Sequence, residues 1–358
     1  MMTFIKRLHH PVTYVILFLM LAELILPALL LEPLSEDNFY PRNPYFRRNW
    51  DEYIRVTSKH HDPEYRILLI SNSQGVGLEY SEDQIYTTLL QDYFNHAANG
   101  GQRIRLINWS IVGIQAPELI FLLARARELQ PQLVLCILGP TAFKARSYIY
   151  DGKPTPITMF PSDVLDTVWF YRDLLPASYR EHYIKNIYFV SGLFSRYWTL
   201  YRLRELPLAM LLQRARFLMP FVPPSQRFTW LKKPSKLQRL KKPKKKNFAK
   251  MPPHPELLKM TREVSQDLHA KKIFIMQPHG FVVTKGEEIF ANAIQDSLKA
   301  ANWEFWDMTS AVPWNQFLKD AAHFTDQGHR IFADSLAIRL EPILKNRELT
   351  HRFAKVDP

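Results

Sequence analysis

Short apolar runs alternate with helical patterns along two stretches of this 358-residue chain. Residues 66–70 read RILLI, a largely continuous apolar run of the kind found in strands that are buried on both faces. Strand alternating with helix predicts a parallel sheet covered by helices on both sides, a three-layer α/β/α fold. The expected strands are residues 66–70, 103–108, 132–138, 272–277 and 303–308, and the expected helices are residues 81–96, 117–129, 256–269, 287–300 and 327–344.

The alternation stops near residue 141 and resumes near residue 256, so we expect an insertion over residues 146–253 between two parts of the sheet domain, 65–145 and 254–358. Residues 186–222 mix aromatic and aliphatic side chains with arginines, as amphipathic interfacial elements do. Residues 227–250 hold eleven Lys or Arg and no acid, so most of the formal net charge of +13 is local. A packed subdomain and a solvated loop are the alternative interpretations.

Residues 12–31 are almost wholly apolar and have the length that spans a bilayer core. Lys6 and Arg7 precede the run, which predicts a cytoplasmic N-terminus. No small-residue cleavage site follows, so an uncleaved anchor is favoured over a signal peptide. We therefore expect residues 1–31 to be a cytoplasmic tip and single transmembrane helix, residues 32–64 a stalk, and the rest an extracytoplasmic part, at a bacterial inner membrane with the catalytic domain in the periplasm.

Polar residues at both ends of the sheet domain have the pattern of a serine nucleophile and its base. Ser73 follows the first strand in the sequence SNSQG, where parallel α/β domains bind ligands. Asp320 and His323 lie three residues apart just before the last helix. A serine hydroxyl is a poor nucleophile without a base, and the Asp would orient and stabilise the imidazole. The sequence thus predicts a catalytic triad of Ser73, His323 and Asp320.

The blocks SNSQG and FLKDAAHFTDQGHRIFA resemble those of the SGNH/GDSL hydrolase superfamily, over about residues 66–141 and 256–344. The resemblance implies an SGNH-like (flavodoxin-like) domain that acts through an acyl-Ser73 intermediate. It implies that backbone N–H groups of Ser73 and of Gly113, in NWSIVG, bind the oxyanion together with Thr141. Thr141 stands where the family has Asn, and one lost oxyanion donor costs roughly 2.7–4 kcal/mol. This departure is compatible with a slow hydrolase or with a transferase.

The chain combines one N-terminal span, an extracytoplasmic SGNH domain and a third sequence block in which Thr141 replaces the family's Asn. In this combination it is similar to proteins that work beside membrane-bound O-acyltransferases. These are the D-alanyl transfer protein of teichoic acid D-alanylation and the SGNH proteins of alginate O-acetylation. This second resemblance implies a multi-span O-acyltransferase partner and a cell-envelope polymer as acceptor. The alternatives are a simple carboxylesterase and a catalytically degenerate SGNH module that only binds.

The remaining expectations concern ligands. His279 and Asn72 follow strands at the same end of the sheet and are candidate substrate contacts. The sequence shows no metal-ligand spacing and no phosphate-binding loop, so no metal or other cofactor is expected. The basic residues 227–250 are expected to attract anionic lipid or an envelope polymer, at about 1 kcal/mol per basic residue near a charged membrane. Nucleic acid is not expected as a partner because the anchor places this run outside the cytoplasm.

Overall fold

The computed structural model describes residues 11–30, 50–59, 64–77, 80–97, 103–111, 113–143, 165–183, 193, 239–244, 253–282 and 284–345. The chain divides into two compact units. The first, called the sheet unit here, comprises Tyr40–Arg42, Ser58–Ser147 and Lys232–Pro358. The second unit comprises Met1–Phe39, Asn43–Thr57 and Tyr148–Leu231. Both sequence blocks that carry the predicted triad therefore belong to the sheet unit.

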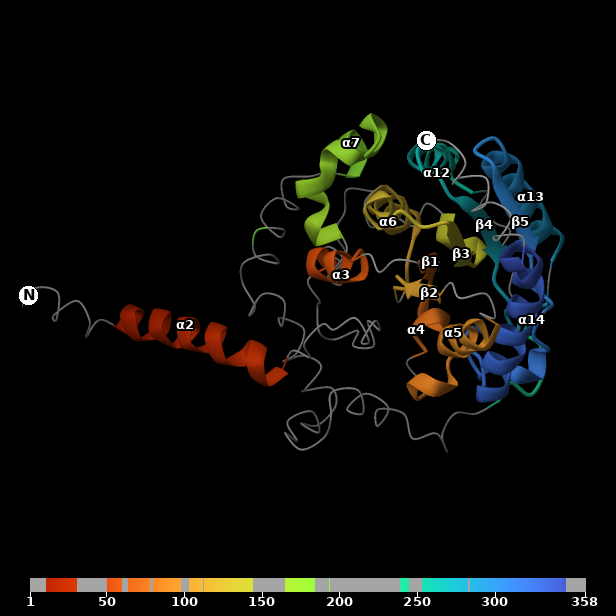
Figure 1. Cartoon of the computed structure of the whole chain (residues 1–358), viewed down its shortest axis with the longest axis horizontal. Coiled ribbons are helices and arrows are strands. Elements are labelled where there is room, and N and C mark those ends of the chain that lie inside the picture. Colours follow the sequence, from red (N-terminus) through yellow and green to blue (C-terminus); the bar gives the residue numbers. More distant parts are fainter. Residues whose placement is uncertain are drawn as a thin grey trace, which may run out of the picture. The chain divides into compact units, whose positions relative to one another are not determined.

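Five parallel strands form the sheet in the order β2-β1-β3-β4-β5 (Figure 1). The chain leaves β1 toward one edge, then returns to form β3 on the other side of β1, which creates a switch point between these two strands. Each predicted strand is present to within two residues at either end. The strands are β1 (Glu64–Ser71), β2 (Arg103–Asn108), β3 (Leu133–Leu138), β4 (Lys271–Met276) and β5 (Trp303–Asp307).

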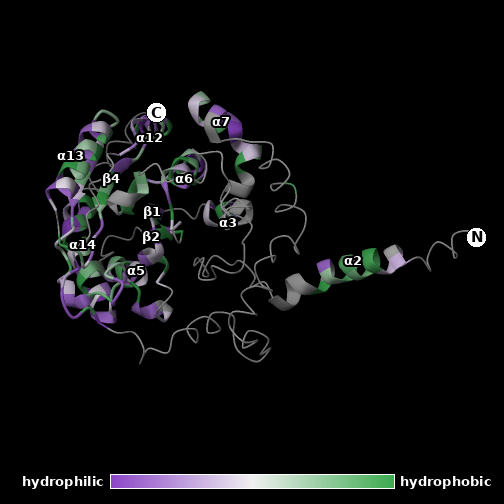
Figure 2. Cartoon of the chain, turned by 180° about the vertical axis from the view of Figure 1, so that it is seen from behind, coloured by the Kyte–Doolittle hydropathy of each residue, from purple (hydrophilic) through white to green (hydrophobic). Residues whose placement is uncertain are grey.

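Helices cover both faces of the sheet, which confirms the predicted three layers. On one face α5 packs against α14, and on the other α12 packs against α6 and α13 (Figure 1). Figure 2 shows that α13 and α14 carry both hydrophilic and hydrophobic residues, as expected for helices with one face on a sheet. The helices are α4 (Ser73–Val76), α5 (Tyr86–Ala97), α6 (Ala116–Leu129), α12 (Pro255–Gln266), α13 (Lys285–Lys299) and α14 (Asp326–Lys345).

One expected helix start is wrong. Ser81 and Gln84 form the side-chain contact of a capping box, with the Ser81 N–H 3.2 Å from Gln84 Oε1. The turn that they close is a 3-10 helix over Glu82–Gln84, and α5 begins only at Tyr86. The local motif therefore marks a turn that leads into the helix and not the first turn of the helix itself.

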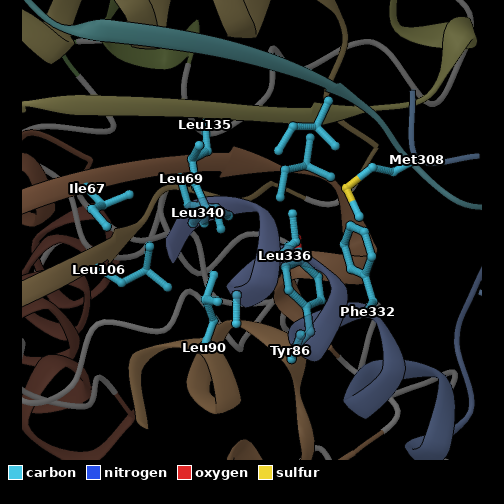
Figure 3. Close-up of a cluster of buried hydrophobic side chains, with 14 of the residues drawn as sticks. Ile67, Leu69, Tyr86, Leu90, Leu106, Leu135, Met308, Phe332, Leu336 and Leu340 are labelled. Carbon is cyan, nitrogen blue, oxygen red and sulfur yellow. The ribbon is translucent and has the colours of Figure 1, made fainter. Parts of the chain in front are cut away.

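The core on the α5 and α14 side is built by alternate residues of the strands. Figure 3 shows Ile67, Leu69 and Leu135 pointing from the sheet toward Leu90 of α5 and Leu336 of α14. Successive strand residues face opposite sides, so their neighbours, such as Leu68 and Cys136, are buried on the other face. Each such side chain contributes about 1.5–3 kcal/mol by leaving water. Burial also raises the pKa of the Cys136 thiol, which keeps it protonated and inert.

The described helices of the second unit are α2 (Pro11–Leu30), α3 (Trp50–Thr57), a 3-10 helix over Leu165–Leu174 and α7 (Ala177–Tyr183). Among the helices within the described ranges, none combines the length and the hydropathy required to cross a bilayer. The anchor expected over residues 12–31 stays a prediction. The stalk, residues 32–64, lies outside the described residues except for 50–59 and 64.

The insertion is only partly described, and one of its boundaries differs from the prediction. Residues 186–222 lie outside the described residues apart from Leu193, and residues 227–250 lie outside them apart from 239–244. Residues from Lys232 onward group with the sheet unit, whereas the sequence pattern placed all of 146–253 in the insertion. The physical reason is visible at Leu240, which is buried and whose N–H donates to Phe317 O at 2.8 Å.

Candidate active site

Ser73 is the first residue of α4, a single helical turn at the carboxyl end of β1. Asn72 precedes it in an extended conformation and caps the turn, because its Oδ1 accepts the Gln74 N–H at 3.0 Å. The Asn72 side-chain amide also donates to Gln277 Oε1 at 2.6 Å, at the end of β4. Asn72 was expected as a substrate contact, but both polar atoms of its side chain have protein partners. These contacts hold Ser73 at the switch point of the sheet, and a contact of Asn72 with substrate stays a prediction.

The structure brings the three predicted catalytic side chains together in one hydrogen-bonded chain. His323 Nε2 lies 2.8 Å from Ser73 Oγ, and His323 Nδ1 lies 2.7 Å from Asp320 Oδ2. A carboxylate only accepts, so Nδ1 carries the proton toward Asp320 and Nε2 is left to accept the Ser73 hydroxyl proton. This is the geometry that a general base requires for activating a serine hydroxyl.

Asp320 is held as a carboxylate. Its partial burial opposes ionisation, but the hydrogen bond and charge of His323 act in the other direction. The backbone N–H groups of Ala322 and His323 add to this, donating to Oδ1 at 2.9 Å and 3.0 Å. Together these contacts hold the pKa of Asp320 well below its usual value. An ionised Asp320 fixes the imidazole and stabilises the imidazolium that forms when His323 takes a proton.

The loop that carries Asp320 and His323 is tied down from several sides. Ala321 adopts a left-handed conformation with φ of 63°, which costs an L-residue roughly 1–2 kcal/mol. The Ala321 carbonyl accepts the Gly280 N–H at 2.9 Å, and the His323 carbonyl accepts the Leu318 N–H at 2.7 Å. Strain of this kind persists where surrounding contacts determine the backbone, as at many functional sites.

Gln74 links this loop to the nucleophile turn. Its side chain is buried, and its amide Nε2 donates to the carbonyl of Pro278 at 3.1 Å and to the carbonyl of Ala322. Both partners are acceptors, so the amide nitrogen must face them. One side chain beside Ser73 therefore joins the residue before His323 to the loop after β4.

Gly75 permits the nucleophile turn to lie directly on its neighbour strands. A Cβ at this position would lie 2.4 Å from Ser110 Oγ and 2.8 Å from Ser71 Cβ, which no real side chain tolerates. The Gly75 carbonyl accepts the Asn108 side-chain amide at 2.9 Å, and Asn108 Oδ1 accepts the Ser110 N–H at 3.0 Å. This buried polar network fixes the height of Ser73 above the sheet.

Backbone pairing carries Gly113 to the same end of the sheet as Ser73. Beyond β2 the chain still pairs with β1, since the Ile111 N–H donates to Ser71 O at 2.9 Å. The Ile114 N–H then closes a turn onto Ile111 O at 3.2 Å, with Gly113 at the position that needs its φ of 71°. Within the described residues, the N–H groups of Ser73 and Gly113 make no hydrogen bond, and their binding of an oxyanion stays a prediction.

Thr141 is the third expected oxyanion residue, and only its backbone is among the described parts of the structure. It lies in the 3-10 turn Pro140–Phe143 that directly follows β3, the strand next to β1. Its position is therefore at the correct end of the sheet, and its side chain lies outside the description. Whether its hydroxyl donates to an oxyanion stays a prediction.

His279 is an interior residue. Its ring Nε2 is paired with the buried carboxylate of Glu287, and its Nδ1 accepts the Phe281 N–H at 3.2 Å. Because both ring nitrogens have protein partners, the placement favours a structural role over the expected substrate contact. The pair supports the loop whose Gly280 holds Ala321.

Several residues of the site were not predicted from the sequence. His329 lies fully buried in α14, and its Nδ1 accepts the Tyr86 N–H at 3.3 Å. Burial and the nearby charge of His323 lower the pKa of His329 to about 3, so His329 is neutral. Gln74, Ser110 and His329 have partners far away in sequence or on another element, so no local spacing pointed to them. Among the described residues, no group of His, Cys, Asp and Glu is arranged to hold a metal ion.

Comparisons with known proteins add little to this geometry. No protein-family model matches the chain, and no curated protein matches it. It is similar to the psychrotrophic esterase EstA from Pseudoalteromonas sp., in a structure inhibited by monoethylphosphonate, with 13% identity, a TM-score of 0.39, and 79% of this chain and 100% of that chain covered. It is also similar to TesA, with 13% identity, a TM-score of 0.38, and 77% and 98% covered. Such scores support no conclusion about activity, so the interpretation depends on the site itself.

Proposed function

We propose that this protein is an SGNH-type serine enzyme that transfers an acyl group through an acyl-Ser73 intermediate. The observation that carries the proposal is the chain of hydrogen bonds from Asp320 through His323 to Ser73. A buried serine with a structural role has no need of an imidazole that is oriented by a carboxylate. We assign the N–H groups of Ser73 and Gly113, which lie at the same end of the sheet, as donors to the developing oxyanion.

The reaction follows from these positions. His323 Nε2 takes the proton of Ser73 Oγ as the oxygen attacks the acyl carbonyl, and the carbonyl oxygen becomes an oxyanion. The imidazolium, stabilised by Asp320, then gives its proton to the leaving alcohol as the carbon–oxygen bond breaks. In the second half, a water or an acceptor hydroxyl loses its proton to His323 and attacks the acyl-Ser73 ester. This releases an acid or an acylated acceptor and regenerates Ser73.

The finer proposal is that the enzyme is a single-pass protein of a bacterial inner membrane with its catalytic domain outside the cytoplasm. It is supported by the apolar residues 12–31 and by the basic residues that precede them. In this proposal the acceptor is a cell-envelope polymer, and a multi-span O-acyltransferase supplies the acyl group. Thr141 stands in place of the family's Asn, and the weaker oxyanion site that this implies is compatible with a transferase as well as with a slow hydrolase.

The basic activity is tested with a neutral ester. The full chain, purified in uncharged detergent, should hydrolyse p-nitrophenyl acetate, and Ser73→Ala should not. If the acyl-enzyme partitions to glycerol or a sugar hydroxyl more often than to water, the protein is a transferase. If it partitions only to water, it is a simple carboxylesterase. If the folded wild-type chain turned over no ester, the remaining interpretation would be a catalytically degenerate module that only binds.

The location is tested separately. An alkaline phosphatase fused after Pro358 should be active in the cell, whereas a reporter that works only in the cytosol should be silent there. The opposite pair of results would remove the envelope polymer as acceptor, and it would leave the chemistry of Ser73 untouched.

A further inference from the structure

A short basic segment, residues 239–244, is fixed to the sheet unit by its backbone. Arg239 forms an antiparallel bridge with Leu318, and Lys244 forms a parallel bridge with Phe281. The Lys244 N–H donates to Gly280 O at 3.2 Å, and the Val282 N–H donates to Lys244 O at 2.9 Å. We call residues 239–244 the basic strip.

The two attachment points of the basic strip belong to the loops that hold the triad. Leu318 donates its N–H to the carbonyl of His323 at 2.7 Å. Gly280 donates its N–H to the carbonyl of Ala321 at 2.9 Å, and a Cβ on Gly280 would meet Leu240 at 2.7 Å. The basic strip is therefore packed onto the loop that presents His323 to Ser73.

The charged residues of the basic strip are exposed. Within the described ranges, no carboxylate forms an ion pair with any of its four cations, which are Arg239, Lys241, Lys242 and Lys244. Cations elsewhere on the sheet unit do find partners, as Lys271 does with Glu304 at 2.9 Å and Arg127 does with Asp267 at 2.6 Å. Four like charges on six residues repel each other, and a bound anion would relieve this repulsion.

We propose that the basic strip is a binding site for a polyanionic substrate of the Ser73 site, a polymer that carries carboxylate or phosphate groups beside the hydroxyl or ester that reacts. This rests on the proposed function and names its substrate class. A cluster of one sign raises the local concentration of oppositely charged ligand over a range set by the Debye length, about 8 Å at physiological salt. An acidic lipid surface is the rival partner. The attachment to the His323 loop favours the substrate, because a lipid contact has no need to be fixed to the catalytic residues.

The experiment measures binding of fluorescently labelled polygalacturonate to the full chain in uncharged detergent, with labelled dextran as the neutral control. We expect wild type to bind polygalacturonate and not dextran, and raising salt from 50 to 200 mM to weaken the binding. The variant Lys241→Gln/Lys242→Gln should bind polygalacturonate about 3- to 10-fold more weakly. The matched variant Lys259→Gln/Lys299→Gln removes two exposed charges from α12 and α13 and should bind like wild type.

Several results would overturn the proposal. Equal weakening in the two double variants would mean that net charge, and not the basic strip, attracts the polymer. The Lys241→Gln/Lys242→Gln variant could also lose p-nitrophenyl acetate turnover by the same factor as polymer affinity. That result would show that the basic strip only supports the loop. Binding to vesicles with 30% anionic lipid, but not to polygalacturonate, would assign the basic strip to the membrane. Because the readout is binding, a failure of Ser73 to react with any ester would refute the proposed function without deciding this inference.

Discussion

Gln74 is predicted to position His323 relative to Ser73. Its side chain is 2% exposed, and its amide joins the nucleophile turn to Pro278 and to Ala322, the residue before His323. Replacing it by methionine keeps the length of the side chain and removes the donor. We expect Gln74→Met to destabilise the sheet unit and to slow turnover by moving His323 away from Ser73.

The magnitude follows from the hydrogen bonds that are lost and gained. Two carbonyls lose their donor, at about 1–3 kcal/mol for each buried acceptor left unpaired. Among the described residues, no group donates to the buried Gln74 Oε1, so its removal returns about the cost of one such group. The net expectation is a loss of about 1–3 kcal/mol in the free energy of unfolding. A displacement of the base by 1 Å can lower kcat by about 100-fold.

The assay combines urea unfolding, followed by circular dichroism, with the kcat and KM for p-nitrophenyl acetate. Gln295→Met, on the exposed side of α13, is the matched control and should leave all three quantities unchanged. A role in positioning predicts a fall in kcat with little change in KM. If Gln74→Met lost stability but kept kcat within twofold of wild type, Gln74 would support the fold alone and the reasoning would be wrong.

Three further predictions concern neighbouring groups. Asp320→Asn should lower kcat by roughly 10²- to 10⁴-fold in the same ester assay, because the neutral amide no longer stabilises the imidazolium; an unchanged kcat would exclude Asp320 from the triad. Gly75→Ala should cost about 1–3 kcal/mol in urea unfolding, and adding Ser110→Ala should recover part of the loss because it removes the atom 2.4 Å from the new methyl group. His329 has a pKa of about 3 in the folded chain, against 6.5 ordinarily, so the unfolded state binds a proton that the folded state does not. Stability should therefore fall as pH drops from about 6.5 toward 3, by at most about 1.4 kcal/mol per unit, and His329→Gln should have a shallower slope; identical slopes would contradict a neutral buried His329.

Strand positions were predictable because buried parallel strands are continuous apolar runs. RILLI and LVLCIL have the length of a strand and lie between turns, and both form interior strands of the sheet. Helix ends were less predictable. The contact of Ser81 with Gln84 is present, but it closes a 3-10 turn, and the side chains that decide where α5 begins include partners on α14, such as His329.

The hydrogen-bonded arrangement of Ser73, His323 and Asp320 was predictable because these residues lie in two local blocks whose strand context places them at one end of the sheet. The residues that support this arrangement were not predictable. Gln74 meets Ala322 across 248 positions of the sequence, and Ser110 fits against Gly75 only through the register of β1 and β2. The basic strip was assigned to the insertion by composition. A single buried leucine, Leu240, and a few backbone hydrogen bonds place it with the catalytic loop instead.

The central claim is that Ser73 is a nucleophile activated by His323. A fluorophosphonate probe, which reacts covalently with activated serines, tests it directly when the full chain is labelled and the modified peptide is identified by mass spectrometry. We expect one label, on Ser73, which is absent in Ser73→Ala and strongly slowed in His323→Ala, with circular dichroism spectra unchanged. A label on another residue, or labelling that persists in Ser73→Ala, would contradict it.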